Sequence, residues 1–280
     1  MLSPGFFLTA LAVLLATLAA WRQWDRRREE AVWRRLIALH AGTRQVFQAA
    51  MVDGLPEPAQ RYFHYTIKVG TPLAPVVDVD MAGDIGLGAQ EAPKYRPLQA
   101  RQILASPHGF LWSMTSGAIS GSDGALPGKS WTCFWLWNLI PVARATGPDH
   151  LRSSFGRLVA DAVLWAPASL LPGNGVSWEA LGEDCARVTV RHGLLEQAVD
   201  VHVNAEGAPV RVLFQRWSDA NPQRHYQLQP FGGELSEFRE FAGYRLPTCV
   251  IAGNHYGTAA YFPFFKVRVS AIRFPDAPPT

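Results

Sequence analysis

The stretch QAVDVHVNAEGAPVRVLFQRW, residues 197–217, determines the fold class that we predict for this chain of 280 residues. Apolar and polar side chains alternate over residues 197–203 and again over 209–217, which is the period of a strand with one buried face. Between these runs, the segment Asn204-Ala205-Glu206-Gly207 is typical of a tight turn. The stretch therefore predicts a β-hairpin within an antiparallel sheet.

Similar alternation recurs along most of the chain. The runs follow one another at intervals of roughly 10–15 residues, with glycine, proline, asparagine and aspartate in the gaps, which is typical of an antiparallel meander. Further strands are expected at residues 76–81, 98–104, 109–114, 185–190, 243–251 and 265–274. The prediction is an α+β fold, mainly β, in which a strongly curved, half-barrel-like antiparallel sheet is covered by a helix.

Helix signals are fewer. Helix-spaced apolar residues behind an acidic start predict the covering helix at residues 149–163, and a shorter helix is expected at 59–67. A further helical pattern over residues 25–51 ends at the proline-containing turn of residues 53–58. We interpret this pattern as a stalk that packs one face on the globular domain. A helix lying flat on anionic lipid is the alternative.

The amino-terminal segment is long and apolar enough to cross a membrane. From Leu2 to Trp21 it has no charged side chain, and at about 1.5 Å per residue it spans about 30 Å, the thickness of a bilayer's hydrocarbon core. Trp21 and Trp24 fit an interfacial aromatic belt, and Arg22 with Arg26–Arg28 is expected to reach the phosphate layer. The alternatives are a cleaved signal peptide, which carries its positive charge before the apolar run, and a buried core helix, which shows a polar face.

These patterns divide the chain into a transmembrane anchor at residues 1–21, a basic helical stalk at 22–54 and a β-rich globular domain at 55–280. Six of the 26 basic and three of the 23 acidic residues fall within residues 22–35, which leaves 20 of each elsewhere. This neutral body excludes the basic face that nucleic-acid binding requires. Because arginines are retained on the cytoplasmic side, residues 22–280 are expected in the cytoplasm, and three widely separated cysteines fit that reducing compartment.

The glycine- and serine-rich stretches lack the spacing of catalytic motifs. Residues 123–130 resemble a phosphate loop, but Asp123 stands where glycine is needed, and its charge repels an anion. Residues 116–123 do not fit the Gly-x-Ser-x-Gly nucleophile elbow. No pair of the eight histidines has metal-ligand spacing on one helix. We therefore predict no metal site and no cofactor.

Aromatic residues gather at 131–137 and 256–265. Core packing, the lining of an apolar ligand site and a patch that dips into the bilayer surface are the open interpretations. Because the domain is expected beside lipid, we favour non-enzymatic binding of an apolar or lipid-like small molecule in the concave face of the sheet. Membrane lipid is the expected partner of the amino-terminal helix. Candidate lining residues are Trp112, Trp135, Trp165, Phe214 and Trp217.

Two other functions remain open. An enzyme acting on a membrane-associated substrate would bring titratable side chains together in one pocket. Its candidate polar residues are Arg61, His64, Arg101, Glu234 and Glu240. If their segment forms a strand, at most Glu234 and Glu240 of the neighbouring glutamates share a face. A protein-interaction module would instead show an exposed apolar patch without an enclosed cavity.

Three stretches carry a family resemblance. They are LPEPAQRY at residues 55–62, AVLWAPASLLP at 162–172, and FGG at 231–233 followed by GYRLPT at 243–248. Together they resemble an uncharacterised bacterial family of membrane-anchored β-rich domains without an assigned activity, over about residues 55–275. The resemblance implies no catalytic residue. A looser similarity is to curved-sheet lipoprotein carriers, which hold acyl chains between a bent antiparallel sheet and helices.

Overall fold

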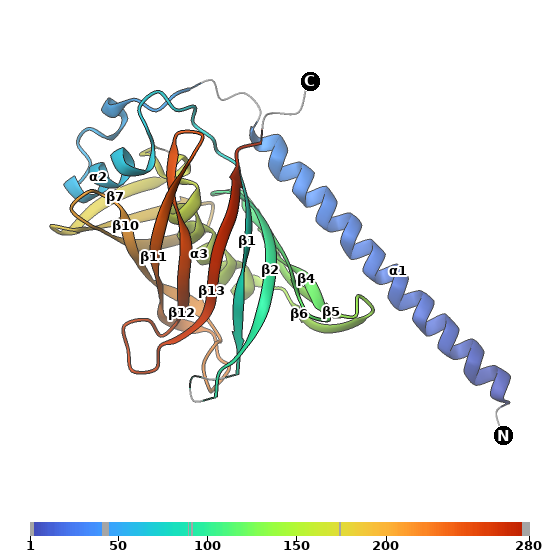
Figure 1. Ribbon diagram of the computed structural model, residues 1–280. Helices are drawn as coiled ribbons and strands as arrows, with labels where there is room; N and C mark the ends of the chain where they lie inside the picture. The colour runs from blue at the N-terminus through green and yellow to red at the C-terminus, as the bar shows by residue number, and fades with distance from the viewer. Residues whose placement is uncertain (1–2, 41–44, 89, 91, 174, 276–280) are drawn as a thin grey trace.

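Strand alternation builds a curved sheet that wraps around one helix. In the computed structural model, which describes residues 3–40, 45–88, 90, 92–173 and 175–275, this sheet has 13 antiparallel strands in the order β6-β5-β4-β3-β2-β1-β13-β12-β11-β10-β9-β8-β7 (Figure 1). Its first half contains β1 (Val77–Leu87), β2 (Lys94–Ala105), β3 (Gly109–Ser116), β4 (Ile119–Leu126), β5 (Lys129–Leu136) and β6 (Ile140–Ala145). Its second half contains β7 (Val176–Gly182), β8 (Cys185–His192), β9 (Leu195–Val203), β10 (Pro209–Ser218), β11 (Gln227–Phe241), β12 (Tyr244–Asn254) and β13 (Phe262–Arg273). The predicted fold class is confirmed.

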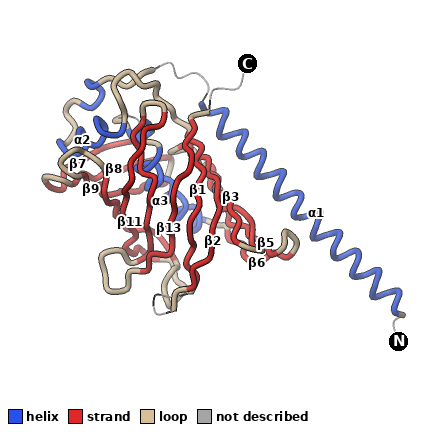
Figure 2. The backbone as a smooth tube through the Cα atoms, in the orientation of Figure 1, coloured by secondary structure: helices blue, strands red, loops and turns tan. Residues whose placement is uncertain are grey.

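Two meanders meet at the centre of the sheet. Strands β1 to β6 follow one another as antiparallel neighbours, as do β7 to β13, and the pairing of β1 with β13 joins the two halves (Figure 2). The predicted hairpin is the pair β9–β10, in which Val212 lies opposite Val201. Its turn is held by Asn204 Oδ1, which accepts hydrogen bonds from the backbone N–H groups of Glu206 and Ala208 at 3.0 and 2.9 Å.

Helix α3 (Pro148–Trp165) lies in the concave face of the sheet and forms the centre of the core (Figure 1). Its Trp165 indole N–H donates a 3.3 Å hydrogen bond to the Pro247 carbonyl of β12. Helix α2 (Glu57–Thr66) packs beside it, where the fully buried Tyr62 donates a 2.8 Å hydrogen bond to the Val163 carbonyl. Both helices lie within two residues of their predicted bounds at each end.

Helix α1 (Pro4–Ile37) is continuous and has two different environments. Its amino-terminal part is exposed and extends away from the sheet, beyond the β5–β6 hairpin (Figure 1). Further along, Val32 and Leu36 are buried against β2–β5 on the face opposite α3, in one apolar cluster with Trp131 and Trp135. The carboxyl-terminal part of α1 is therefore packed on the sheet. Residues 1–2 of the predicted anchor lie outside the described residues.

A buried polar joint attaches α1 to β5 and β6. The Asp25 carboxylate is 5% exposed and accepts hydrogen bonds from the Cys133 thiol and the Trp135 indole N–H, both at 3.1 Å. Arg144 of β6 completes the joint through an ion pair with Asp25. Burial, together with the neighbouring Asp25, raises the pKa of the Cys133 thiol to about 11. This thiol therefore stays protonated at neutral pH and serves as a hydrogen-bond donor.

Arg22 is buried next to this joint. Its Nε donates to Asn138 Oδ1 at 3.3 Å and its Nη1 to Glu29 at 3.4 Å. The side chain therefore pairs with protein groups and does not reach lipid phosphate as the sequence predicted. The reason is helical spacing: residues 22, 25, 29, 32 and 36 form one stripe at intervals of three and four residues, and this stripe faces the sheet.

The helix predicted over residues 25–51 is shorter in the structure. Helix α1 ends at Ile37, and Phe47 is extended, with its backbone N–H and carbonyl paired to residues 70–71 at 2.8 and 2.9 Å. Phe47 is fully buried in the core, so tertiary packing overrides the helical spacing of its apolar neighbours. Short 3₁₀ turns are η1 (Ala38–His40), η2 (Ala49–Val52) and η3 (Pro167–Leu170).

Five strands lie where the sequence predicted none: β4, β5, β6, β7 and β11. The sequence of β4 resembles a glycine- and serine-rich loop because its neighbours approach closely. A Cβ atom on Gly121 would lie 2.0 Å from the Cys133 carbonyl oxygen, and one on Gly124 would lie 2.4 Å from the Trp131 ring. Small residues are therefore required at these two positions of the strand.

Candidate functional site

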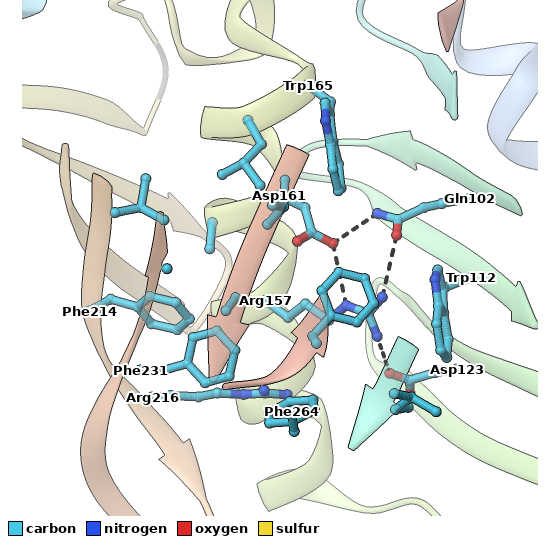
Figure 3. Close-up of a pocket in the computed structure, with 18 of the residues that line it drawn as sticks. Gln102, Trp112, Asp123, Arg157, Asp161, Trp165, Phe214, Arg216, Phe231 and Phe264 are labelled. Atoms are coloured by element: carbon cyan, nitrogen blue, oxygen red, sulfur yellow. Dashed lines mark hydrogen bonds and ion pairs between the residues drawn. The ribbon is translucent and has the colours of Figure 1, made fainter. Parts of the chain in front are cut away.

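A pocket of about 250 Å³ lies between α3 and the concave face of the sheet (Figure 3). Both halves of the sheet contribute to it, β1–β5 on one side and β10–β13 on the other. Its apolar lining consists of Ile85, Trp112, Phe134, Ala160, Leu164, Trp165, Val212, Phe214, Phe231, Val250, Ala252, Phe264 and Phe265. Its polar lining consists of Gln102, Asp123, Thr132, Arg157, Asp161 and Arg216. We call this the central pocket.

Strand alternation determines which side chains reach the central pocket. On β10, Val212, Phe214 and Arg216 all line it, because residues two apart share a face. On β5 the same rule selects Thr132 and Phe134. The residues between and beside them, Trp131, Cys133 and Trp135, face α1 on the other side of the sheet.

An ionic cluster occupies one wall of the central pocket. The Arg157 guanidinium donates hydrogen bonds to Asp123 Oδ2 at 2.7 Å, to Asp161 Oδ2 at 3.3 Å and to Gln102 Oε1 at 3.3 Å (Figure 3). Gln102 Nε2 in turn donates to Asp161 Oδ2 at 2.8 Å. Arg157 also lies over the Trp112 ring, 5.0 Å from its centroid. The donors and acceptors of this cluster satisfy one another, so Arg157 is held in one position.

Burial changes the proton affinity of two charged groups in the central pocket. Burial raises the pKa of Asp161, and the opposing effects of Arg157 and Gln102 are smaller. Burial also lowers the pKa of Arg216, and the positive charge of Arg157 lowers it further. Both shifts disfavour the charged form, because an isolated charge is costly in an apolar environment.

A second polar chain connects the cluster with the first turn of α3. Thr132 Oγ1 donates to Asp123 Oδ1 at 2.9 Å and lies 2.9 Å from His150 Nε2. The other ring nitrogen, His150 Nδ1, lies 2.7 Å from Ser130 Oγ. Burial lowers the pKa of His150, and the opposing effect of Asp123 is smaller. The folded protein therefore favours the neutral imidazole.

The predicted ligand-lining residues fall into two groups. Trp112, Trp165 and Phe214 line the central pocket. Trp135 lies on the opposite face of the sheet, against α1, because it is one residue out of phase with Phe134. Trp217 is likewise one residue out of phase with Arg216, and its indole N–H donates to Asp149 at 2.8 Å, outside the pocket.

The predicted polar residues are distributed over three elements: Arg61 and His64 on α2, Arg101 on β2, and Glu234 and Glu240 on β11. Arg61 binds Asp184 and Glu57, Arg101 binds Asp78, and His64 is exposed. Glu234 and Glu240 are six residues apart, about 20 Å along a strand. Within the described part of the chain, no hydrogen bond or ion pair joins any two of the five. The structure does not assemble them into one site.

Sequence patterns did not identify the ionic cluster. One signal was present, because Arg157 and Asp161 are four residues apart and interrupt the apolar face of the predicted covering helix. Asp123 and Gln102 lie close to Arg157 only because of the order of the strands in the sheet, and no local sequence pattern indicates that contact. Among the residues that the structure describes, no group of three or more histidine, cysteine, aspartate or glutamate side chains is arranged to hold a metal ion.

Comparison with known proteins places the chain in a family. A family model described as a family of unknown function (DUF6544) matches residues 45–267, and the chain belongs to this family. This fits the resemblance to an uncharacterised family. Comparison with curated proteins found no relative.

Two solved structures are similar to this chain. One is a LolA superfamily protein from Nitrosomonas europaea, with a TM-score of 0.45 and 11% sequence identity, over 79% of this chain and 93% of that chain. The other is a putative outer membrane lipoprotein-sorting protein domain from Vibrio parahaemolyticus, with a TM-score of 0.39 and 12% identity, over 71% of this chain and 85% of that chain.

The lowered pKa of His150 predicts a pH-dependent stability. In the unfolded chain this histidine takes up a proton near its ordinary pKa of about 6.5, whereas the folded state resists protonation. The free energy of unfolding should therefore decrease as the pH falls from about 7 to about 5.5, and less so in the variant His150→Gln. Denaturant unfolding followed by tryptophan fluorescence measures this, with the exposed His64→Gln as the control. Equal pH dependence of His150→Gln and wild type would contradict the assignment.

Proposed function

We propose that this protein binds an apolar or lipid-like molecule in the central pocket and holds it at a membrane surface. The observation that carries the proposal is the pocket itself, which is enclosed by α3 and the sheet and lined mainly by aromatic and aliphatic side chains. Its volume of about 250 Å³ is below the roughly 300–1,000 Å³ typical of sites for drug-sized ligands. We therefore expect a single acyl chain or a small apolar molecule.

The alternatives find less support in the structure. An enzyme built on the five predicted polar residues would need them in one place, and they lie on three elements. A protein-interaction module would leave its apolar surface open, whereas most of the aromatic side chains predicted to line a site are enclosed between α3 and the sheet. Ligand binding is the function that uses the enclosed apolar space.

Helix α1 supports attachment to a membrane. The most apolar window of the helical segment has a mean hydropathy of 1.9, and none of it is buried in the protein. The helix continues without a break from this window into the stripe that packs on the sheet. We infer a retained anchor, because the segment that follows the apolar stretch is part of the domain's own packing. The arginines after the apolar stretch favour a cytoplasmic domain.

Filling the central pocket should remove the ligand. Val212, 5% exposed, lines the pocket, whereas Val210 on the same strand is 37% exposed and lies outside it. The variant Val212→Trp should carry several-fold less bound lipid than wild type, because the indole occupies the space of the ligand. Lipid extraction and mass spectrometry of the purified full chain measure the bound amount. The matched variant Val210→Trp should retain the wild-type amount, and a wild-type protein free of lipid would overturn the proposal.

The proposed topology has its own test. Protease added to intact spheroplasts should leave residues 22–280 undigested, and digestion should follow only after lysis. The intact mass of the purified chain should include residues 1–21, since we expect no cleavage after the apolar stretch. Digestion before lysis places the domain outside, and a mass that lacks the first 21 residues identifies a signal peptide.

A further inference from the structure

Arg216 is the charged group of the central pocket that the protein leaves without a partner. Its guanidinium lies over the Phe231 ring, 5.0 Å from the centroid, and its Nε atom is fully buried without a hydrogen-bond partner (Figure 3). Within the described residues, no ion pair or hydrogen bond joins this side chain to another protein group. An arginine in such a place costs free energy unless something of opposite charge accompanies it.

The other polar groups of the central pocket supply that partner only in part, because the charges of Asp123 and Asp161 raise the pKa of Arg216 by less than burial lowers it. Both carboxylates, Asp123 and Asp161, are bound by Arg157 at 2.7 and 3.3 Å. A second donor, the Trp112 indole N–H, is also buried without a partner. The unsatisfied polar atoms among the lining residues are therefore donors, and what the pocket lacks is an acceptor.

We propose that the ligand of the central pocket is an anionic amphiphile, whose carboxylate or phosphate oxygens bind Arg216 while its chain lies against the aromatic wall. This inference rests on the proposed binding function and adds the chemical class of the head group. Arginine suits this role because its planar guanidinium donates two parallel hydrogen bonds to a carboxylate or a phosphate. The head group supplies the acceptors and the negative charge, and the apolar lining accepts the chain.

Photo-crosslinking of the full chain in a non-ionic detergent tests this proposal. Three probes carry the same eight-carbon chain with a diazirine, a length that suits the volume of the pocket: a fatty acid, the corresponding primary alcohol and the corresponding alkyl phosphate. Mass spectrometry of digested protein locates the labelled residues. In wild type, at least one anionic probe should label the pocket-lining residues roughly tenfold more than the alcohol does, the difference expected for a charge-assisted hydrogen bond. The more efficient anionic probe identifies the head group as carboxylate or phosphate.

Two arginine variants separate the charge from the pocket. Arg216→Met should label equally with the anionic probes and the alcohol, at the level that the alcohol reaches in wild type. Arg216→Lys keeps the positive charge and should retain part of the preference for the anionic probes. Arg211→Met, an exposed position on the same strand, makes the same change in net charge and should behave as wild type. Equal labelling of wild type by acid and alcohol overturns the anionic class alone, whereas no labelling of the pocket by any probe overturns the binding function as well.

Thermal unfolding gives a second readout of the same arginine. Because Arg216 is half-buried and makes no hydrogen bond or ion pair within the described residues, replacing it with methionine should not lower the unfolding temperature of lipid-free protein. Addition of the fatty acid should raise the unfolding temperature of wild type and not that of Arg216→Met. A decrease in the lipid-free variant would show that a protein group already partners Arg216, which contradicts the proposal.

A separate observation concerns the turn between β5 and β6. Trp137 and Asn138 have positive φ angles of 52° and 55°, a conformation that a tryptophan rarely adopts. This turn displays Trp137 with 70% of its surface exposed, next to Ile140 and Val142, which are 43% and 50% exposed. Unusual backbone that exposes a large aromatic side chain is a feature of binding surfaces.

The turn lies beside the end of the apolar part of α1. Asn138 Oδ1 accepts hydrogen bonds from Arg22 Nε at 3.3 Å and from Ser120 Oγ at 2.7 Å. Trp21 packs edge-on against Trp135 with ring centroids 5.5 Å apart. Residues 21–22 are also where the predicted membrane span ends. If α1 crosses a bilayer, this contact places the turn at the depth of the lipid head groups.

We infer that the tip of the β5–β6 hairpin inserts into the surface of the same bilayer that holds α1. Tryptophan suits this position because its ring has an apolar body and a polar N–H group. The hairpin and the anchor then contact the membrane side by side, and the joint at Asp25 fixes one to the other. The inference rests on α1 acting as an anchor.

Fluorescence quenching in vesicles of phosphatidylcholine with brominated acyl chains tests this contact. The chain has ten tryptophans, so removing a quenched one lowers the quenched fraction of the total emission, and removing an unquenched one raises it. Trp137→Phe should lower the fraction, and Trp178→Phe, on β7 away from the anchor, should raise it. Trp24→Phe, on the exposed surface of α1, is the reference for the anchor. A rise with Trp137→Phe overturns the hairpin contact, and a rise with Trp24→Phe overturns the anchor.

Discussion

The alternation of side chains along β2 to β5 is the constraint on which the rest of the structure depends. Residues two apart share a face, so each of these strands divides its side chains between the concave and the convex surface. Helix α3 covers the first surface and the sheet-packed part of α1 covers the second. The pocket and the surface that α1 packs on therefore lie on opposite faces of the same strands. On β5, Phe134 lines the pocket, while the indole N–H of the next residue, Trp135, donates a hydrogen bond to Asp25 of α1.

Sequence patterns predicted the fold where one face of an element is polar. The hairpin β9–β10 and the covering helix have such a period, and the structure contains both; the amino-terminal apolar segment has no polar face and was predicted from its length and composition. The pattern failed in β4, where both faces are buried, and in β6 and β7, which are mostly exposed, because alternation is lost in both cases. In β4, Gly121 and Gly124 make room for Cys133 and the Trp131 ring, and their sequence resembles a loop. Such strands are defined by their neighbours, and local propensity carries little information about them.

Part of the candidate site was also predictable from residue type and from strand alternation. Trp112, Trp165 and Phe214 were candidates because they are large and apolar, which is sufficient for the wall of a pocket. The phase of the strand carried further information: Arg216 shares its face with Val212 and Phe214, and Trp217 does not. The ionic cluster depends on more than phase. It joins α3 to β2 and β4, and only the order of the strands brings Asp123 and Gln102 to Arg157.

The continuity of helix α1 has a mechanical consequence. Its 34 residues form a continuous rod of roughly 50 Å, and the buried side chains at one end lock that rod to the sheet. In a chain with a flexible linker, the orientation of a domain is independent of the span that anchors it. If α1 spans a membrane as proposed, any tilt of the helix inclines the sheet by the same angle. Because bilayer thickness influences the tilt of a membrane span, a thicker or thinner bilayer would change the angle at which the sheet stands on the membrane.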